Sequence, residues 1–140
     1  MLTFIYTRCP MPDYCPLMSN NFSKIREDLL TRPESKNNTR LLSITVDPDF
    51  DKPAVLREYG LRYAGSDKDA VFKMWEFATG TPEQIKAVAQ FFGLNYWPEK
   101  GQIIHGLRTA IIAPDGRVFK IYRGNEWKPS EIVEQLGRIK

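Results

Sequence analysis

The sequence predicts one α/β domain with a central mixed sheet that is parallel in its first half, ends in an antiparallel hairpin and is flanked by helices. Two short apolar runs, Leu2–Thr7 and Leu41–Val46, enclose a segment with helical spacing, the pattern of a right-handed βαβ unit. Two later runs are joined by Pro114-Asp115-Gly116, a tight-turn sequence. The 140 residues suffice for one domain, residues 1–140, with its own core.

The first half of the chain supplies the parallel strands. Leu2–Thr7 carries no charge and fits a strand buried on both faces. An amphipathic helix with Pro16 in its first turn follows, because apolar residues then recur every three or four positions. These residues are Met18, Phe22, Ile25 and Leu29. The polar stretch Thr31–Thr39 predicts a loop, and Leu41–Val46 predicts the second buried strand.

The middle of the chain carries weaker signals. Asp51 is predicted to cap a short helix that has Pro53 in its first turn and ends near Gly60. Gly65–Asp69 is predicted as a polar loop, and Val71–Phe77 as a strand interrupted by charged residues.

The next helix has the clearest start signal in the chain. Thr81 and Gln84 form a capping box, Pro82 takes the first helical position, and Gly93 predicts the end. Its predicted buried face consists of Ile85, Val88, Ala89 and Phe92.

The C-terminal part predicts an antiparallel ending. Asn95–Ile104 is predicted as a loop, followed by strands over Leu107–Ala113 and Arg117–Tyr122 and a last helix capped by Ser130. The apolar face of that helix is Ile132, Val133, Leu136 and Ile139. This order of elements is the thioredoxin arrangement with an insertion in the middle.

Composition excludes several classes of function. The net charge of +3 comes from scattered basic residues, so we expect no nucleic-acid binding. No apolar stretch approaches the ~20 residues of a membrane helix, so we expect no membrane contact by this domain itself. Because the first predicted strand begins almost at Met1, we expect the domain to be N-terminally trimmed. Two cysteines are too few for a disulfide-built scaffold.

Both cysteines lie in one proline-interrupted loop. Cys9 follows the first strand, and Cys15 stands just before a helix, where the dipole and free N–H groups favour a thiolate. Thiolates are redox nucleophiles and soft ligands that suit Cu(I). A structural disulfide and two buried free thiols remain open alternatives.

His105 is the only histidine in the chain. It precedes the strand Leu107–Ala113, which in a thioredoxin arrangement runs beside the strand leading to Cys9, so we expect it to face the cysteine loop. An imidazole and two thiolates suit a three-coordinate copper site, whereas zinc usually takes a fourth ligand, for which Asp13 is the nearby candidate. A histidine on the surface or satisfied in the core is the alternative.

The sequence resembles the Sco (Sco1/SenC) family of thioredoxin-fold copper-binding proteins along nearly its whole length. The resemblance rests on four stretches: Phe4 to Pro10 with Pro12 to Pro16, Ser43 to Pro48 followed by Pro53 and Leu56, Trp75 to Gly80, and His105 nine residues before Pro114-Asp115-Gly116.

The resemblance implies that Cys9, Cys15 and His105 are copper ligands and that the two cysteines are also a redox-active pair. It further implies an extracytoplasmic location, in the periplasm or at the outer face of the inner membrane, although this chain shows no signal or anchor. This chain departs from the family in having five residues between the cysteines where three are usual, and in lacking the strands that usually precede the first core strand.

Three functions follow from these observations. The first is a metallochaperone that passes copper to a partner, by resemblance a cytochrome c oxidase subunit. The second is a thiol–disulfide oxidoreductase acting on a disulfide partner, with Cys15 favoured as nucleophile if the helix dipole dominates. The third, a peroxidase-like protein using Thr7 and Arg8 beside Cys9, matches only loosely.

Overall fold

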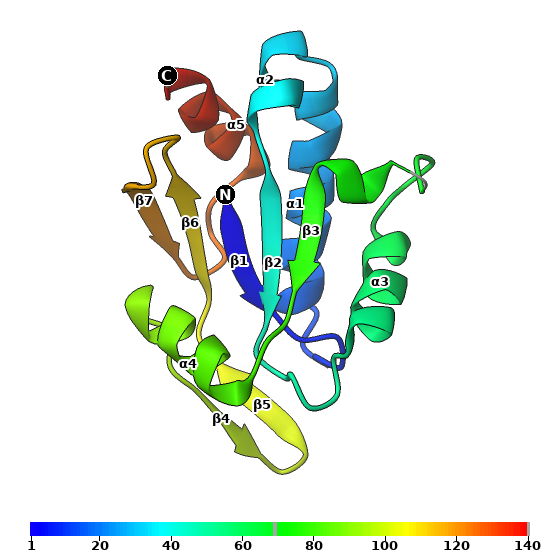
Figure 1. Ribbon diagram of the computed structural model, residues 1–140, viewed down its shortest axis with the longest axis vertical. Coiled ribbons are helices and arrows are strands. Elements are labelled where there is room, and N and C mark those ends of the chain that lie inside the picture. The colour runs from blue at the N-terminus through cyan, green and yellow to red at the C-terminus, as the bar shows by residue number, and fades with distance from the viewer. Residues whose placement is uncertain (69, 140) are drawn as a thin grey trace.

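A five-stranded sheet forms the centre of the protein, as Figure 1 shows for the computed structural model. The structure describes residues 1–68 and 70–139. The helices are α1 (Cys15–Leu30), α2 (Pro33–Asn38), α3 (Pro53–Arg62), the 3₁₀ turn η1 (Val71–Lys73), α4 (Pro82–Phe91) and α5 (Pro129–Arg138). The strands are β1 (Leu2–Ile5), β2 (Leu41–Thr45), β3 (Trp75–Ala78), β4 (Tyr96–Glu99), β5 (Gln102–His105), β6 (Arg108–Ile112) and β7 (Val118–Arg123).

The sheet has the strand order β3-β2-β1-β6-β7. Strands β1, β2 and β3 are parallel, whereas β6 is antiparallel to both β1 and β7. This confirms the predicted mixed sheet with a parallel first half and an antiparallel C-terminal hairpin. Every residue of β1 is buried because it is the central strand, covered on both faces.

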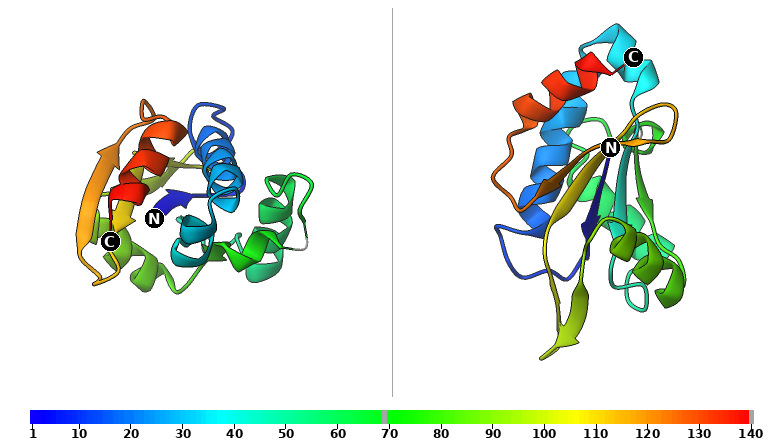
Figure 2. Two further views of the ribbon diagram at one scale, coloured as in Figure 1. Left: turned by 90° about the horizontal axis from the view of Figure 1, so that it is seen from above. Right: turned by 90° about the vertical axis from the view of Figure 1, so that its left-hand side faces the viewer.

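Helices cover both faces of the sheet. Figure 2 shows α1 and α5 packed side by side on one face, with α3 and α4 on the other. All four apolar residues predicted for the buried face of the first helix have no exposed surface: Met18, Phe22, Ile25 and Leu29. The apolar stripe of a helix must be buried against another element, and here the sheet buries it.

The local signals located the elements better than their ends. The capping box of Thr81 and Gln84 is present at α4, and Gly93 follows this helix with a φ of 74°. Val88, predicted to be buried there, is 37% exposed. The strand predicted over Val71–Phe77 is correct only for its second part, because its first residues form η1.

Two predicted helix caps are wrong. Lys52 occupies the N-cap of α3 in place of Asp51, and Lys128 occupies that of α5, so Ser130 lies inside the first turn. In both helices proline stands immediately after the cap, where its fixed φ starts the helix without a side-chain cap.

Two segments predicted as loops contain regular structure. Within Thr31–Thr39 the structure places α2, a short helix without buried residues. Pro33 at its start and Glu34 in its first turn are helix-start signals that the polar composition masked. Residues 65–68 of the loop predicted over Gly65–Asp69 contain turns and no helix or strand, and Asp69 lies outside the described residues.

The segment Asn95–Ile104 is mostly a β-hairpin and not a loop. Strands β4 and β5 pair in register with Glu99 opposite Gln102, which leaves a two-residue turn of Lys100 and Gly101. Both turn residues have positive φ, 49° and 75°, as a tight hairpin turn of this type requires. Figure 1 shows this hairpin projecting beyond the end of the sheet where β1 and β2 end.

Candidate metal centre

Three elements bring sulfur and nitrogen donors together at the carboxyl end of the parallel strands. Cys9 lies in the loop after β1, Cys15 is the first residue of α1, and His105 is the last residue of β5. One donor atom from each of these residues lies within 4.8 Å of the other two. Asp13 is not part of this group. The structure thus brings all three predicted site residues to one place.

The imidazole of His105 is held in a single orientation. Its Nδ1–H donates to the backbone carbonyl of Gly106 at 2.6 Å, which leaves Nε2 facing Cys15 Sγ at 3.4 Å. The rings of Tyr6 and Tyr14 meet the imidazole edge-on, with centroid distances of 5.5 and 6.2 Å. A ligating histidine typically has its second ring nitrogen bonded in this way, so Nε2 is the nitrogen available to a metal.

The two thiols are not bonded to each other and occupy different environments. Cys15 is fully buried, whereas Cys9 is partly exposed. A hydrogen bond from the Cys15 thiol, with a further contribution from His105, lowers the pKa of Cys9 to about 4. The same hydrogen bond and burial raise the pKa of Cys15.

This difference reverses the expected order of the two thiols. The exposed thiolate is Cys9, and Cys15 is the protected thiol. The position of Cys15 at the start of α1 favours a charge there, but burial and the neighbouring thiolate outweigh the helix dipole.

A buried carboxylate fixes the start of the cysteine loop. Asp51 has no exposed surface and accepts hydrogen bonds from the backbone N–H of Thr7 at 3.0 Å, from the Thr7 hydroxyl and from the Thr45 hydroxyl at 2.6 Å. Asp51 therefore joins Thr7, in the turn after β1 and two residues before Cys9, to Thr45 at the end of β2. The sequence predicts Asp51 as a helix cap, and no local pattern shows that one of its partners, Thr7, stands 44 residues earlier in the chain.

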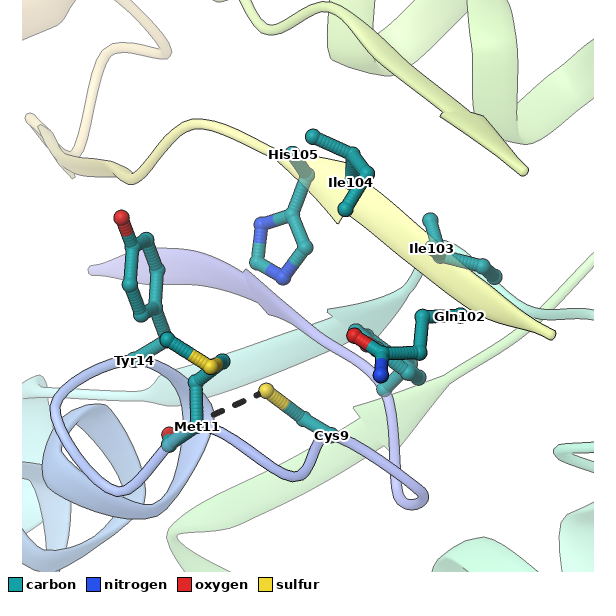
Figure 3. A pocket seen from close by; sticks show the side chains of 8 residues that line it. Cys9, Met11, Tyr14, Gln102, Ile103, Ile104 and His105 are labelled. Atoms are coloured by element: carbon teal, nitrogen blue, oxygen red, sulfur yellow. Dashed lines mark hydrogen bonds between the residues drawn. The ribbon is translucent and has the colours of Figure 1, made fainter. Parts of the chain in front are cut away.

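Cys9 and His105 line a cavity of about 140 Å³ between the cysteine loop and β5 (Figure 3), whereas the buried Cys15 is not part of its lining. Its lining residues are Tyr6, Cys9, Met11, Tyr14, Gln102, Ile103, Ile104 and His105. The contribution of β5 was missed because the segment was predicted as a loop. The Lys100-Gly101 turn sequence was the signal that could have revealed the hairpin.

The chemistry of the donor set selects among metals. Two cysteine sulfurs and one imidazole nitrogen form a soft group suited to Cu(I), and one partly exposed sulfur leaves the site accessible. Structural zinc sites are closed by four protein ligands. Among the cysteine, histidine and acidic residues that the structure describes, three form this group: Cys9, Cys15 and His105.

The fold and this site together define a thioredoxin-like protein with a soft-metal donor group built around a reduced cysteine pair. The family model for SCO1/SenC proteins matches residues 1–140, and the chain belongs to that family. Known structures of Sco proteins superpose on this chain and have the same thioredoxin-like fold.

Individual relatives show how far the similarity extends. The SCO1 protein homolog of Bacillus subtilis is 32% identical over 135 residues, 93% of this chain and 64% of the relative. The chain therefore spans just under two thirds of that relative's length. The Arabidopsis thaliana ScoI structure with copper bound superposes with a TM-score of 0.79 at 21% identity, covering 96% of this chain and 78% of that one.

Two bacterial structures are also similar. BsSco, a member of the Sco family of cytochrome c oxidase assembly proteins in which a disulfide switch was identified, gives a TM-score of 0.74 at 30% identity, covering 97% of this chain and 76% of that one. A SCO1/SenC family lipoprotein from Bacillus anthracis gives a TM-score of 0.76 at 27% identity, covering 99% of this chain and 80% of that one.

Across the described residues, none of the helices has the length and apolarity to cross a bilayer.

Proposed function

We propose that this chain is a copper metallochaperone domain of the Sco type, in which Cys9, Cys15 and His105 hold copper and release it to a partner protein. The observation that carries the proposal is the convergence of these three donor atoms within 4.8 Å. The copper-bound Arabidopsis relative supports the choice of metal.

The arrangement suits transfer by ligand exchange. Cys9 is partly exposed and its thiolate needs no deprotonation near neutral pH, so an incoming thiolate of the partner can reach copper at this side. Cys15 and the oriented His105 are buried behind it and retain the ion until the last exchange step. An ion held by three donors has room for a fourth, which is how a partner ligand enters.

We propose that residues 1–140 form a single domain that is located outside the cytoplasm. We further propose that its partner is a copper-accepting subunit of cytochrome c oxidase. The lipoprotein relative from Bacillus anthracis supports the location, and the assembly role of BsSco supports the partner.

A competition titration tests the copper function. The reduced protein is titrated with Cu(I) against a chromogenic chelator under anaerobic conditions, and one-to-one binding is expected. We expect weaker binding, by at least about tenfold, in each of the variants Cys9→Ala, Cys15→Ala and His105→Ala. Loss of a residue that only supports a metal ligand can already lower metal affinity by about tenfold, and loss of a ligand should cost at least as much. Gln102→Ala is the matched control, because Gln102 lines the same cavity outside the donor group. Unchanged affinity in His105→Ala would remove the three-ligand site.

Thiol–disulfide exchange is the second candidate, favoured by the exposed Cys9 thiolate beside the buried Cys15 thiol. Cys9 would attack a partner disulfide and release one partner thiolate. Cys15, losing its proton to His105 Nε2, would then attack Cys9 Sγ and release the second, leaving a Cys9–Cys15 disulfide. Rapid reduction of insulin together with loose copper binding would favour this function over copper transfer.

A further inference from the structure

We propose that Met11 is a fourth copper ligand, whose thioether binds Cu(I) at the mouth of the cavity beside Cys9. This inference rests on the proposed copper function and adds to it a residue that distinguishes the lengthened cysteine loop of this chain.

The exposure of Met11 separates it from the other methionines. The chain has four, and Met1, Met18 and Met74 are 8%, 0% and 3% exposed in the core. Met11 is 50% exposed. Of the four methionines, Met11 is therefore the one whose thioether stands outside the core, where an ion can reach it.

The loop places this side chain at the donor group. Met11 lines the same cavity as Cys9, Tyr14 and His105, and Figure 3 shows the Met11 and Cys9 side chains directed to this cavity from one loop. Its backbone is held, because its carbonyl accepts a hydrogen bond from the Tyr14 N–H at 3.1 Å and lies 4.0 Å from Cys9 Sγ. The backbone is thus fixed at the site while the half-exposed side chain keeps the freedom to adjust to an ion.

The chemistry of a thioether fits the other donors. Methionine sulfur is a soft, uncharged ligand that selects Cu(I) over harder ions. Added to two cysteine sulfurs and one imidazole, it would complete four-coordination without adding charge. Since Met11 stands at the exposed side with Cys9, its weak bond is the one that a partner's ligand displaces first.

X-ray absorption on selenomethionine-labelled protein tests the ligand directly. With all four methionine sulfurs replaced by selenium and one equivalent of Cu(I) bound, we expect copper–selenium scattering. The signal identifies Met11 because the other three methionines are buried in the core, and Met11→Leu should abolish it. Sulfur and nitrogen scattering from Cys9, Cys15 and His105 should persist in that variant.

The affinity for copper gives an independent measurement. Met11→Leu should weaken Cu(I) binding by about tenfold, equivalent to ~1.4 kcal/mol, and leave Cu(II) binding unchanged. Met74→Leu, the same exchange inside the core, is the matched control and should leave Cu(I) binding unchanged.

The outcomes separate this inference from the function on which it rests. Full Cu(I) affinity in Met11→Leu, with no copper–selenium scattering in the labelled protein, overturns the role of Met11 and leaves the three-ligand site standing. Failure of the unsubstituted protein to bind Cu(I) at all overturns the copper function itself.

Discussion

At the scale of single residues, the two cysteines differ because of what surrounds each sulfur. Cys9 lines the cavity and is partly exposed, whereas Cys15 is fully buried. Only one negative charge is favourable in so small a space, and the hydrogen bond from the Cys15 thiol places it on Cys9. The sequence shows two thiols in a loop, and their division into a thiolate and a protected thiol depends on burial.

Alkylation of the reduced, metal-free protein should show this division. Because the pKa of Cys9 is lowered to about 4, its rate of reaction with iodoacetamide should change little from neutral pH down to about pH 5 and fall as the pH passes through 4. Cys15 should stay unmodified below pH 9. Mass spectrometry of the labelled peptide measures both rates.

In the Cys15→Ala variant, the pH midpoint of Cys9 alkylation should move upward, because the main hydrogen bond to the Cys9 thiolate is lost. A midpoint near the ordinary thiol value in the unsubstituted protein would contradict the assignment. The lowered pKa also affects folding. The contribution of Cys9 to the free energy of unfolding is fully present above pH 9, the pKa of this thiol in the unfolded chain, and is lost as the pH falls through about 4.

Among the helices and strands, a predicted capping residue marks the start of a helix only where its hydroxyl reaches a backbone N–H of the first turn. The Thr81 hydroxyl accepts from the Gln84 N–H at 3.2 Å, and the Gln84 side chain accepts from the Thr81 N–H at 2.9 Å. Ser130, also predicted as a cap, lies one residue past Pro129, inside the helix. A proline at the first position thus decided where α5 begins.

The pair Thr81→Ala and Ser130→Ala tests this difference between two predicted caps. Thr81→Ala should lower the free energy of unfolding by about 1 kcal/mol, because it leaves an N–H at the start of α4 without a partner. Ser130→Ala should change it by less than about 0.5 kcal/mol. Urea unfolding monitored by circular dichroism measures both, and equal losses would show that Ser130 acts as a cap after all.

At the scale of the whole molecule, the candidate site joins distant parts of the chain. Cys15 and His105 are 90 residues apart and meet through the Cys15 Sγ to Nε2 contact of 3.4 Å. β1 pairs with β6, which continues the chain after His105, so the sheet itself brings the β5 hairpin over the cysteine loop. A metal held there would link the first strand, the first helix and this hairpin.

Copper should therefore stabilise the folded protein by mass action. With free Cu(I) about a hundredfold above the dissociation constant, the free energy of unfolding should rise by ~2.7 kcal/mol, provided that the unfolded chain binds copper weakly. Differential scanning calorimetry under anaerobic conditions measures the accompanying rise in Tm. The rise should be much smaller in His105→Ala and preserved in Gln102→Ala, and a Tm that ignores copper in the unsubstituted protein would contradict a folded three-ligand site.

The mixed α/β sheet, the main helices and the candidate donors can be predicted from the amino-acid sequence, because apolar periodicity, capping boxes and tight-turn residues act over a few positions. Helix α4 and the Pro114-Asp115-Gly116 turn are read in this way. Three features come from the folded molecule: Asp51 joins the turn after β1 to β2, residues 96–105 form a β-hairpin that lines the cavity, and Cys9 carries the charge. These features depend on contacts between residues far apart in the chain, whose geometry and burial exist only after the sheet has assembled.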